Sequence, residues 1–276
     1  MIKTVGKKKQ ISFKELRNIQ LEILSNVIEF CDKKKIRYYA TAGTLLGAIR
    51  HEGFIPWDDD IDICMPRPDY DIFINEYNKE NPDTYFCHIC ENTENFYFAA
   101  AKVCHEKTIL RENHNVFPNN LGINIDIFPL DGWPANYYEC AKHVYSIDKL
   151  HELILFNNPN YRWHDGIWLN IRKLRKKVIY KADSIQLVKE MNTIARKCSF
   201  DDAEFVGNLM WSQYGYKNCF KKDWFSDFEK KNFETIKINV PVGYISILTQ
   251  LYGDYMKLPP KEKQKIHHAY TKICWK

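Results

Sequence analysis

The chain contains no apolar run that approaches the roughly 18 residues of a membrane-spanning helix. Its first residues, MIKTVGKKKQISFKELRN, include lysines but no apolar stretch after them, so we expect no signal peptide. The nine cysteines are odd in number and scattered, which argues against a disulfide framework and favours buried, reduced thiols. Together these absences predict a cytoplasmic protein.

A strong charge imbalance is also missing. The net charge of +5 is mild, and no basic stripe interleaved with aromatic residues or known RNA-binding motif is present, so we expect no nucleic-acid partner. Such a charge suits anionic substrates or a membrane surface. There is no internal repeat or low-complexity linker, and 45% hydrophobic with 27% charged residues is ordinary for a globular protein.

Hydrophobic periodicity predicts a mixed sheet with helices in the first half of the chain and a mostly helical second half. Ser12 and Glu15 form a capping-box pattern, so a helix is expected from there to about residue 34. We expect strands at 38–42, 60–64, 84–90, 96–104 and 122–128, and helices at 45–50, 68–80, 135–156, 168–181, 184–198 and 243–252. The predicted fold class is α/β (α+β), with a catalytic core over 1–133 and a helical region over 134–276 packed on it.

The most informative segment is TAGTLLGAIRHEGFIPWDDDIDICM at 41–65. Asp60 and Asp62 alternate with isoleucines, so on a strand both carboxylates share one face, about 6.6 Å apart. Like charges this close repel unless a cation lies between them, and oxygen ligands favour Mg²⁺, with Mn²⁺ as an alternative. A solvated edge strand is the competing interpretation, although it rarely needs four acidic residues in five positions (Asp58, Asp59, Asp60, Asp62).

A third carboxylate comes from the run NIDIF at 124–128, in which the isoleucines share one face and leave Asp126 on the other. Asp126 can complete the metal ligation or act as general base for an attacking hydroxyl. Alternatively, Asp126 and Asp131 are ordinary strand-end and turn carboxylates. Gly43 and Thr44, at a strand-to-helix turn, can present N–H groups and a hydroxyl to a phosphate, or form a plain N-cap.

Gly43-Thr44, followed by Asp60 and Asp62 and by Asp126 on a later strand, resembles the nucleotidyltransferase superfamily typified by DNA polymerase β. More closely, the runs GTLLGAIRHEGFIPWDDDIDI, NIDIFPLD and LYGDYMKLPP resemble the LicD family. Those proteins are bacterial phosphocholine transferases, distantly similar to fukutin-type ribitol-phosphate transferases. The resemblance extends from about residue 12 to 268 and implies a nucleotidyltransferase-like mixed sheet flanked by helices. The gap from Gly43-Thr44 to Asp60 is longer than in typical nucleotidyltransferases, as expected for LicD-like chains.

The resemblance implies Mg²⁺-dependent transfer of phosphocholine from CDP-choline to a sugar hydroxyl of a cell-surface glycan precursor (teichoic acid, lipopolysaccharide or capsule), with release of CMP. Asp60 and Asp62 would hold the ion, and Asp126 would ligate it or take the acceptor proton. Lys102, a lone charge in a predicted strand, matches a similarly placed LicD lysine and would neutralise charge at the phosphates. A strand-edge lysine is the alternative.

Arg50 and Arg67 flank the acidic motif. They can bind phosphate, or pair with Asp58 or Asp59, which are themselves active-site candidates. The acceptor would be a glycan or a lipid-linked glycan, and peripheral contact with the inner face of the plasma membrane is a further expectation. The basic helix predicted over 172–181 could lie on such a membrane, or it could simply be a solvated helix.

Choline would be held by cation–π contact with an aromatic face, for which Trp57 is the first candidate and Trp133 the second. Core packing is the alternative for either tryptophan. His267 and His268 close the lysine-rich tail, which either folds back to the active site, as in LicD-like chains, or forms a frayed terminal helix.

Other interpretations remain open. Cys87-His88-Ile89-Cys90 has a CxxC spacing, but no second CxxC exists, so buried thiols are favoured over structural zinc. The donor could instead be CDP-ribitol, CDP-glycerol or CDP-ethanolamine. A nucleotidyltransferase that releases pyrophosphate is a second class of enzyme. A non-catalytic binding module is a third class, which would be favoured by loss of an acidic ligand.

Overall fold

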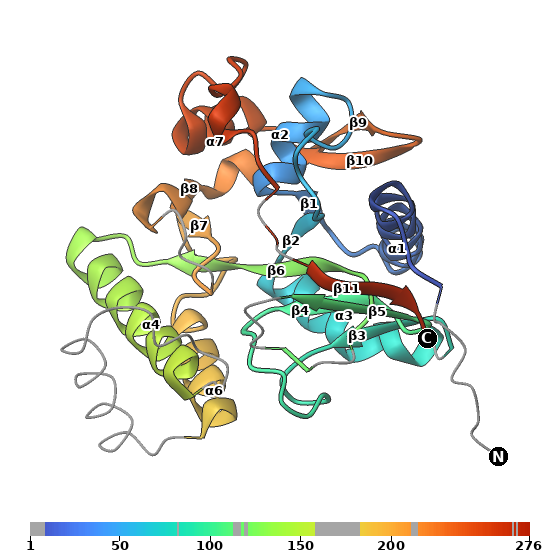
Figure 1. Ribbon diagram of the computed structural model, residues 1–276. Coiled ribbons are helices and arrows are strands. Elements are labelled where there is room, and N and C mark those ends of the chain that lie inside the picture. The colour runs from blue at the N-terminus through green and yellow to red at the C-terminus, as the bar shows by residue number, and fades with distance from the viewer. Residues whose placement is uncertain are drawn as a thin grey trace.

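The computed structural model describes residues 9–81, 83–112, 117–118, 121–157, 183–210, 215–266, 268 and 270–276 (Figure 1). The helix expected over 168–181 and His267 lie outside these ranges. The helices are α1 (Phe13–Lys34), α2 (Ala42–Arg50), α3 (Arg67–Glu80), α4 (Tyr137–Asn157), α6 (Ser184–Ala195) and α7 (Tyr244–Tyr252), with 3-10 turns η1 (Gly215–Asn218), η2 (Lys222–Phe225) and η3 (Lys261–Lys263). None of these described helices is long and apolar enough to cross a bilayer.

A mixed sheet occupies the centre of the fold (Figure 1). Its strands follow the order β1-β2-β6-β4-β3, with β7 pairing to β6 and β8 to β7. Strands β2 and β6 run parallel, and the other pairings within this sheet are antiparallel. The strands are β1 (Tyr39–Ala40), β2 (Asp62–Pro66), β3 (Tyr85–His88), β4 (Ala101–His105), β6 (Asn124–Trp133), β7 (Phe205–Gly207) and β8 (Phe220–Lys221).

The first helix forms as its sequence predicts. The Ser12 hydroxyl accepts a hydrogen bond from the Glu15 N–H, which satisfies one of the free donors of the first turn. Lys35 ends the helix in a left-handed conformation, with φ of 57°. The apolar stripe of α1 is fully buried and includes Leu16 and Val27, and the helix packs on β6 and β4. It therefore supports the strands that carry the acidic residues.

The α+β fold class is confirmed, and the second half of the chain also carries strands that periodicity did not predict. β9 (Phe228–Phe233) and β10 (Ile236–Pro241) form a hairpin, and β11 (Tyr270–Trp275) pairs with β5 (Thr108–Glu112). Five of the six residues of β9 are exposed or half-buried, so its sequence lacks the apolar alternation of a half-buried strand. The division at residue 133 stays a prediction, since β7 extends the sheet of the first region.

Two boundaries differ from expectation within the first half. The strand after the acidic motif begins at Asp62, so Asp60 lies in the preceding loop. The strand expected over 96–104 begins only at Ala101. Phe96 and Phe98 instead pack as a loop cluster with Phe117, with ring centroids 5.4–6.2 Å apart.

Candidate active site

Three charged side chains form a row across the central sheet. Asp62 on β2 is in register with Asp126 on the parallel strand β6, and Lys102 on β4 is in register with Asp126 from the other side. Residues in register lie on the same face of a sheet. The Lys102 ammonium group forms an ion pair with Asp126 and donates to Asn124 Oδ1 at 3.2 Å. The expected convergence of Asp62, Asp126 and Lys102 therefore follows from strand register.

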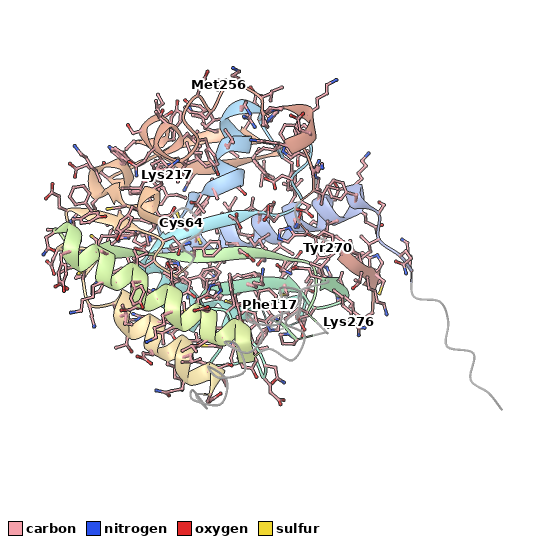
Figure 2. All side chains as sticks on the ribbon, turned by 60° about the vertical axis from the view of Figure 1, so that its left-hand side comes forward. Cys64, Phe117, Lys217, Met256, Tyr270 and Lys276 are labelled. Atoms are coloured by element: carbon pink, nitrogen blue, oxygen red, sulfur yellow. The ribbon has the colours of Figure 1, made fainter. Side chains whose placement is uncertain are left out.

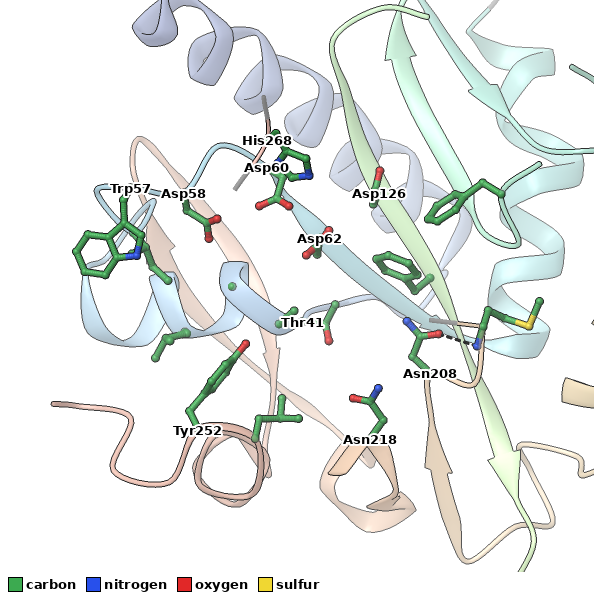
Figure 3. A pocket seen from close by; sticks show the side chains of 18 of the residues that line it. Thr41, Trp57, Asp58, Asp60, Asp62, Asp126, Asn208, Asn218, Tyr252 and His268 are labelled. Carbon is green, nitrogen blue, oxygen red and sulfur yellow. Dashed lines mark hydrogen bonds between the residues drawn. The ribbon is translucent and has the colours of Figure 1, made fainter. Parts of the chain in front are cut away.

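A second acidic group lies in the loop before β2. One carboxylate oxygen from each of Asp58, Asp59 and Asp60 lies within 4.8 Å of the other two. Asp59 is fully buried: its Oδ1 is 2.9 Å from His268 Nδ1, and its Oδ2 has no hydrogen-bond partner among the described residues. Figure 3 shows Asp58, Asp60 and Asp62 directed toward the same cavity, with Asp126 beyond them on the neighbouring strand.

Helix α1 holds this loop through main-chain contacts. The Arg17 guanidinium donates to the carbonyls of Ile55 at 2.9 Å and Pro56 at 3.1 Å, and also to that of Asp58. One turn later, Gln20 Nε2 donates to the carbonyl of Asp59 at 2.9 Å. The backbone on which the carboxylates are mounted is thereby fixed before any ligand binds.

The cations nearby do not fully compensate the negative charge of the acidic residues, so three of the carboxyl groups have raised pKa values. Burial, followed by the charge of Asp60 and a hydrogen bond with it, raises the pKa of Asp58 to about 8. Burial and the neighbouring Asp60 and Asp126 raise the pKa of Asp62 well above its usual value. Burial also raises the pKa of Asp126, although Lys102 opposes this. Burial lowers the pKa of Lys102, but the charges of Asp126 and Glu112 and the hydrogen bond to Asp126 together outweigh this and raise it overall.

This donor set fits a hard divalent cation. Carboxylate oxygens are the ligands that Mg²⁺ prefers, and the unpartnered Oδ2 of buried Asp59 shows that the protein alone leaves the cluster incompletely satisfied. Asp60 and Asp62, which both line the cavity, are the residues that would hold the ion. Asp126 would hold it only by sharing its carboxylate with Lys102.

The N-terminus of α2 opens into the same cavity. Thr41, Ala42 and Gly43 line it, so the free N–H groups of the first turn face the acidic cluster. A Cβ atom on Gly43 would lie 2.5 Å from Asp58 Oδ2, so a larger residue here would displace the Asp58 carboxylate. Thr44, by contrast, is buried, and its hydroxyl accepts a hydrogen bond from the N–H of Asp62 at 2.8 Å. Thr44 therefore anchors β2.

The cavity has a volume of about 1040 Å³. Trp57 lines it beside the acidic loop, and Tyr252 lines it from α7 (Figure 3). Tyr255, shortly after α7, lines it as well. The rings of Phe98 and Phe117 already face the Lys102 ammonium, at 5.2 and 4.8 Å from their centroids. Trp57 and the two tyrosines are thus better placed than these phenylalanines for cation–π contact with a ligand.

Two of the predicted site residues, Trp133 and Arg67, do not line the cavity. Trp133 is 2% exposed and is absent from the cavity lining. Arg67 is also buried away from the cavity and forms a two-pronged ion pair with Asp131, at 2.6 and 2.8 Å. The pairing of Arg67 with Asp58 or Asp59 that the sequence suggested is therefore wrong. Arg50 does line the cavity, and its guanidinium donates to the carbonyl of Tyr255 at 2.7 Å.

The residue that sequence reasoning undervalued is His268. It lines the cavity, and its hydrogen bond to Asp59 raises its pKa to about 9. Tyr270, two residues later, donates from its hydroxyl to the Asp59 carbonyl at 3.4 Å. In the sequence, only the two consecutive histidines of the tail pointed to this residue, and the pairing of β11 with β5 brings His268 to the site.

Cys87, Cys90 and other cysteines of the described chain are free, and most are buried, as expected.

Comparisons with known proteins agree with this geometry. Residues 35–146 match the family described as LicD/FKTN/FKRP, nucleotidyltransferase domain. Over 268 residues the chain is 33% identical to the lipopolysaccharide cholinephosphotransferase LicD of Haemophilus influenzae, covering 94% of this chain and 97% of that protein. A shorter match, 41% identical over 63 residues and covering 23% of each chain, is to an uncharacterized protein of Rickettsia prowazekii. The chain therefore belongs to the LicD family and is a LicD-like phosphotransferase.

Proposed function

We propose that this protein transfers phosphocholine from CDP-choline to a sugar hydroxyl of lipopolysaccharide, releasing CMP, with Mg²⁺ as cofactor. The observation that carries the proposal is the end-to-end similarity to a lipopolysaccharide cholinephosphotransferase, 33% identical over 94% of this chain. The family match over residues 35–146 includes the acidic loop, Lys102 and Asp126, which line the cavity.

The cavity supports a nucleoside-diphosphate donor. It combines the N-terminus of α2 with Asp60 and Asp62, so a diphosphate can receive N–H donors from one side and a carboxylate-bound cation from the other. A bound Mg²⁺ would neutralise negative charge on the diphosphate and orient it toward the acceptor. Arg50, which also lines the cavity, adds positive charge at the opening.

The choline end needs a site for a quaternary ammonium group, which cannot donate a hydrogen bond. Trp57 lies next to Asp58 in the chain, and both line the cavity (Figure 3). An aromatic face together with a carboxylate is the usual combination for such a cation. This pairing supports choline over the uncharged alcohols ribitol and glycerol.

Transfer of phosphocholine requires attack on the phosphorus distal to cytidine. Asp126 is a candidate for receiving the acceptor proton, but its carboxylate is held by Lys102. Lys102 is also placed to neutralise charge that develops at the phosphates. These roles predict that Lys102 and Asp126 act as a unit in the reaction.

The direct test is to incubate the purified protein with CDP-choline, Mg²⁺ and lipopolysaccharide that lacks phosphocholine. We expect equal amounts of CMP and of phosphocholine on the glycan, and neither product when EDTA is added. Release of pyrophosphate from a nucleoside triphosphate would instead indicate a nucleotidyltransferase. Activity with CDP-ribitol, CDP-glycerol or CDP-ethanolamine but not CDP-choline would reassign the donor, and activity with teichoic acid or a capsule precursor would reassign the acceptor. We propose that this chemistry takes place in the cytoplasm, where CDP-alcohols are made.

A further inference from the structure

A lysine-rich segment with exposed apolar side chains forms part of the cavity opening. This rim segment, residues 254–266, reads DYMKLPPKEKQKI. Three of its large apolar side chains are more than half exposed: Met256 by 56%, Leu258 by 53% and Ile266 by 52%. Figure 2 shows Met256 at the outer edge of the molecule, away from the central sheet.

The rim segment has a defined shape, so these exposures do not come from a loose tail. Arg50 donates to the carbonyl of Tyr255 at 2.7 Å, which fixes its beginning. Gln264 Nε2 donates to the carbonyl of Pro259 at 2.8 Å across the turn η3. Shortly after its end, His268 is held against Asp59 at 2.9 Å. The apolar side chains are therefore presented to solvent by an anchored backbone.

The charged side chains of the rim segment are predominantly basic. It holds four lysines against two acidic residues, Asp254 and Glu262. Within the described part of the chain none of the four lysines forms an ion pair, and all four are exposed; they are Lys257, Lys261, Lys263 and Lys265. Unpaired ammonium groups interleaved with protruding apolar side chains complement an anionic lipid surface, which offers negative headgroups above a hydrocarbon layer.

The same segment also contributes to the reaction cavity. Lys257, Leu258, Pro259, Pro260 and Lys263 line it, so a surface that touches the rim segment also covers the cavity opening. We propose that the rim segment docks on an anionic lipid bilayer and thereby presents the cavity to an acceptor anchored in that bilayer. The inference rests on the proposed function for its purpose, but the docking itself is measured without any reaction.

The test uses the full chain and two double variants whose residues do not line the cavity, Lys261→Gln/Lys265→Gln and Met256→Ser/Ile266→Ser. Binding is measured by co-sedimentation with vesicles of phosphatidylcholine alone and with vesicles of phosphatidylcholine and phosphatidylglycerol in equal parts. We expect binding only to the second kind, weakened by salt. We expect a loss of affinity of about 5-fold for each lysine removed and a clear loss for the apolar variant.

A matched control is available on other helices. Lys14 on α1 and Ile72 on α3 are exposed, and α3 lies across the central sheet from α7 in Figure 1. The variant Lys14→Gln/Ile72→Ser should bind vesicles as the parent does, and all variants should keep their thermal midpoints. Absence of vesicle binding, or equal binding by the rim variants and the parent, overturns the proposal. So does a change of oligomeric state in the rim variants without an effect on vesicle binding.

Transfer to a delipidated oligosaccharide acceptor, assayed in parallel, separates the two proposals. Rim variants that lose vesicle binding should retain this transfer. If the parent binds anionic vesicles but shows no transfer, the proposed function fails and the docking surface stands. If transfer occurs and vesicle binding does not, the docking proposal alone is overturned.

Discussion

Asp62 and Asp126 lie directly opposite each other on the parallel strands β2 and β6. Lys102 faces Asp126 from the antiparallel strand β4, so the two neighbours of Asp126 carry opposite charges. Parallel pairing fixes this arrangement, because a shift by one residue would turn each side chain to the other face of the sheet. Asp62 and Asp126 are therefore positioned by strand register, whereas the loop before β2 positions Asp58, Asp59 and Asp60.

The first prediction concerns the two carboxylates proposed to hold Mg²⁺. Asp60→Asn and Asp62→Asn should each reduce transfer by at least about 100-fold, because each removes a charge that positions the cation against the diphosphate. The thermal midpoint should stay the same or rise, since each change relieves repulsion among buried acidic groups. Exposed Asp202→Asn is the control and should leave both quantities unchanged. Full activity in either site variant would remove the proposed mechanism.

Local features of the fold were predictable from sequence, and the long-range contacts were not. The capping box predicted α1, and the alternation in Ile61–Ile63 placed Asp62 correctly on a strand. The start of β2 at Asp62 was missed because Arg17 and Gln20 hold the preceding residues in a loop. Such contacts, 39 and 41 residues apart in sequence, leave no periodic signal.

The contribution of the tail was still harder to predict. His268 and Asp59 are 209 residues apart, and they meet because β11 pairs with β5. Each strand of that pair has only five or six residues, and neither alternates regularly between buried and exposed side chains, so neither has a distinctive sequence pattern. Long-range contacts also decide the places of the two candidate tryptophans: Trp57 lines the cavity and Trp133 lies in the core. Both are the same residue type next to a predicted acidic strand, so the sequence could not tell them apart.

The second prediction separates stability from chemistry at Lys102. Lys102→Met leaves the carboxylate of Asp126 buried without its cation, so it should destabilise the fold by about 3–5 kcal/mol. The double variant Lys102→Met/Asp126→Asn should recover much of that loss, because no charge is left uncompensated. Chemical denaturation measures both. The double variant should nevertheless remain inactive, and restored transfer would contradict a catalytic role for the pair.

The third prediction is that Arg67 stabilises the fold and takes no part in the reaction. Its guanidinium forms two hydrogen bonds to Asp131, and both side chains are almost completely buried. Arg67→Met should lower the free energy of unfolding by about 3–5 kcal/mol, since it strands a buried carboxylate. kcat/KM per folded molecule should be unchanged, because Arg67 does not line the cavity. Measurement at low temperature, where the variant remains folded, checks this, and a selective rise in KM for CDP-choline would return Arg67 to the site.

The fourth prediction compares the two candidate tryptophans. Trp57→Ala should raise KM for CDP-choline by about 5-fold or more, because a cation–π contact contributes about 1 kcal/mol or more when partly desolvated. Trp57→Phe should retain most of the affinity. Trp133→Phe should instead lower the thermal midpoint without changing KM, since Trp133 is a core residue. If Trp57→Ala leaves KM unchanged, choline is bound elsewhere in the cavity.

The last prediction links pH, metal and stability. The pKa of Asp58 is raised from 3.8 to about 8, so between these values the folded chain binds more protons than the unfolded chain. The pKa of His268 is raised from 6.5 to about 9, which has the same sign at higher pH. Stability in EDTA should therefore fall as pH rises through these windows. Calorimetry at a series of pH values should show this fall, and Asp58→Asn should flatten it below pH 8.

Added Mg²⁺ should raise the thermal midpoint most at the high-pH end, where the carboxylates are ionised. An Mg²⁺ effect that is independent of pH, or equal in Asp60→Asn, would place the ion outside this cluster.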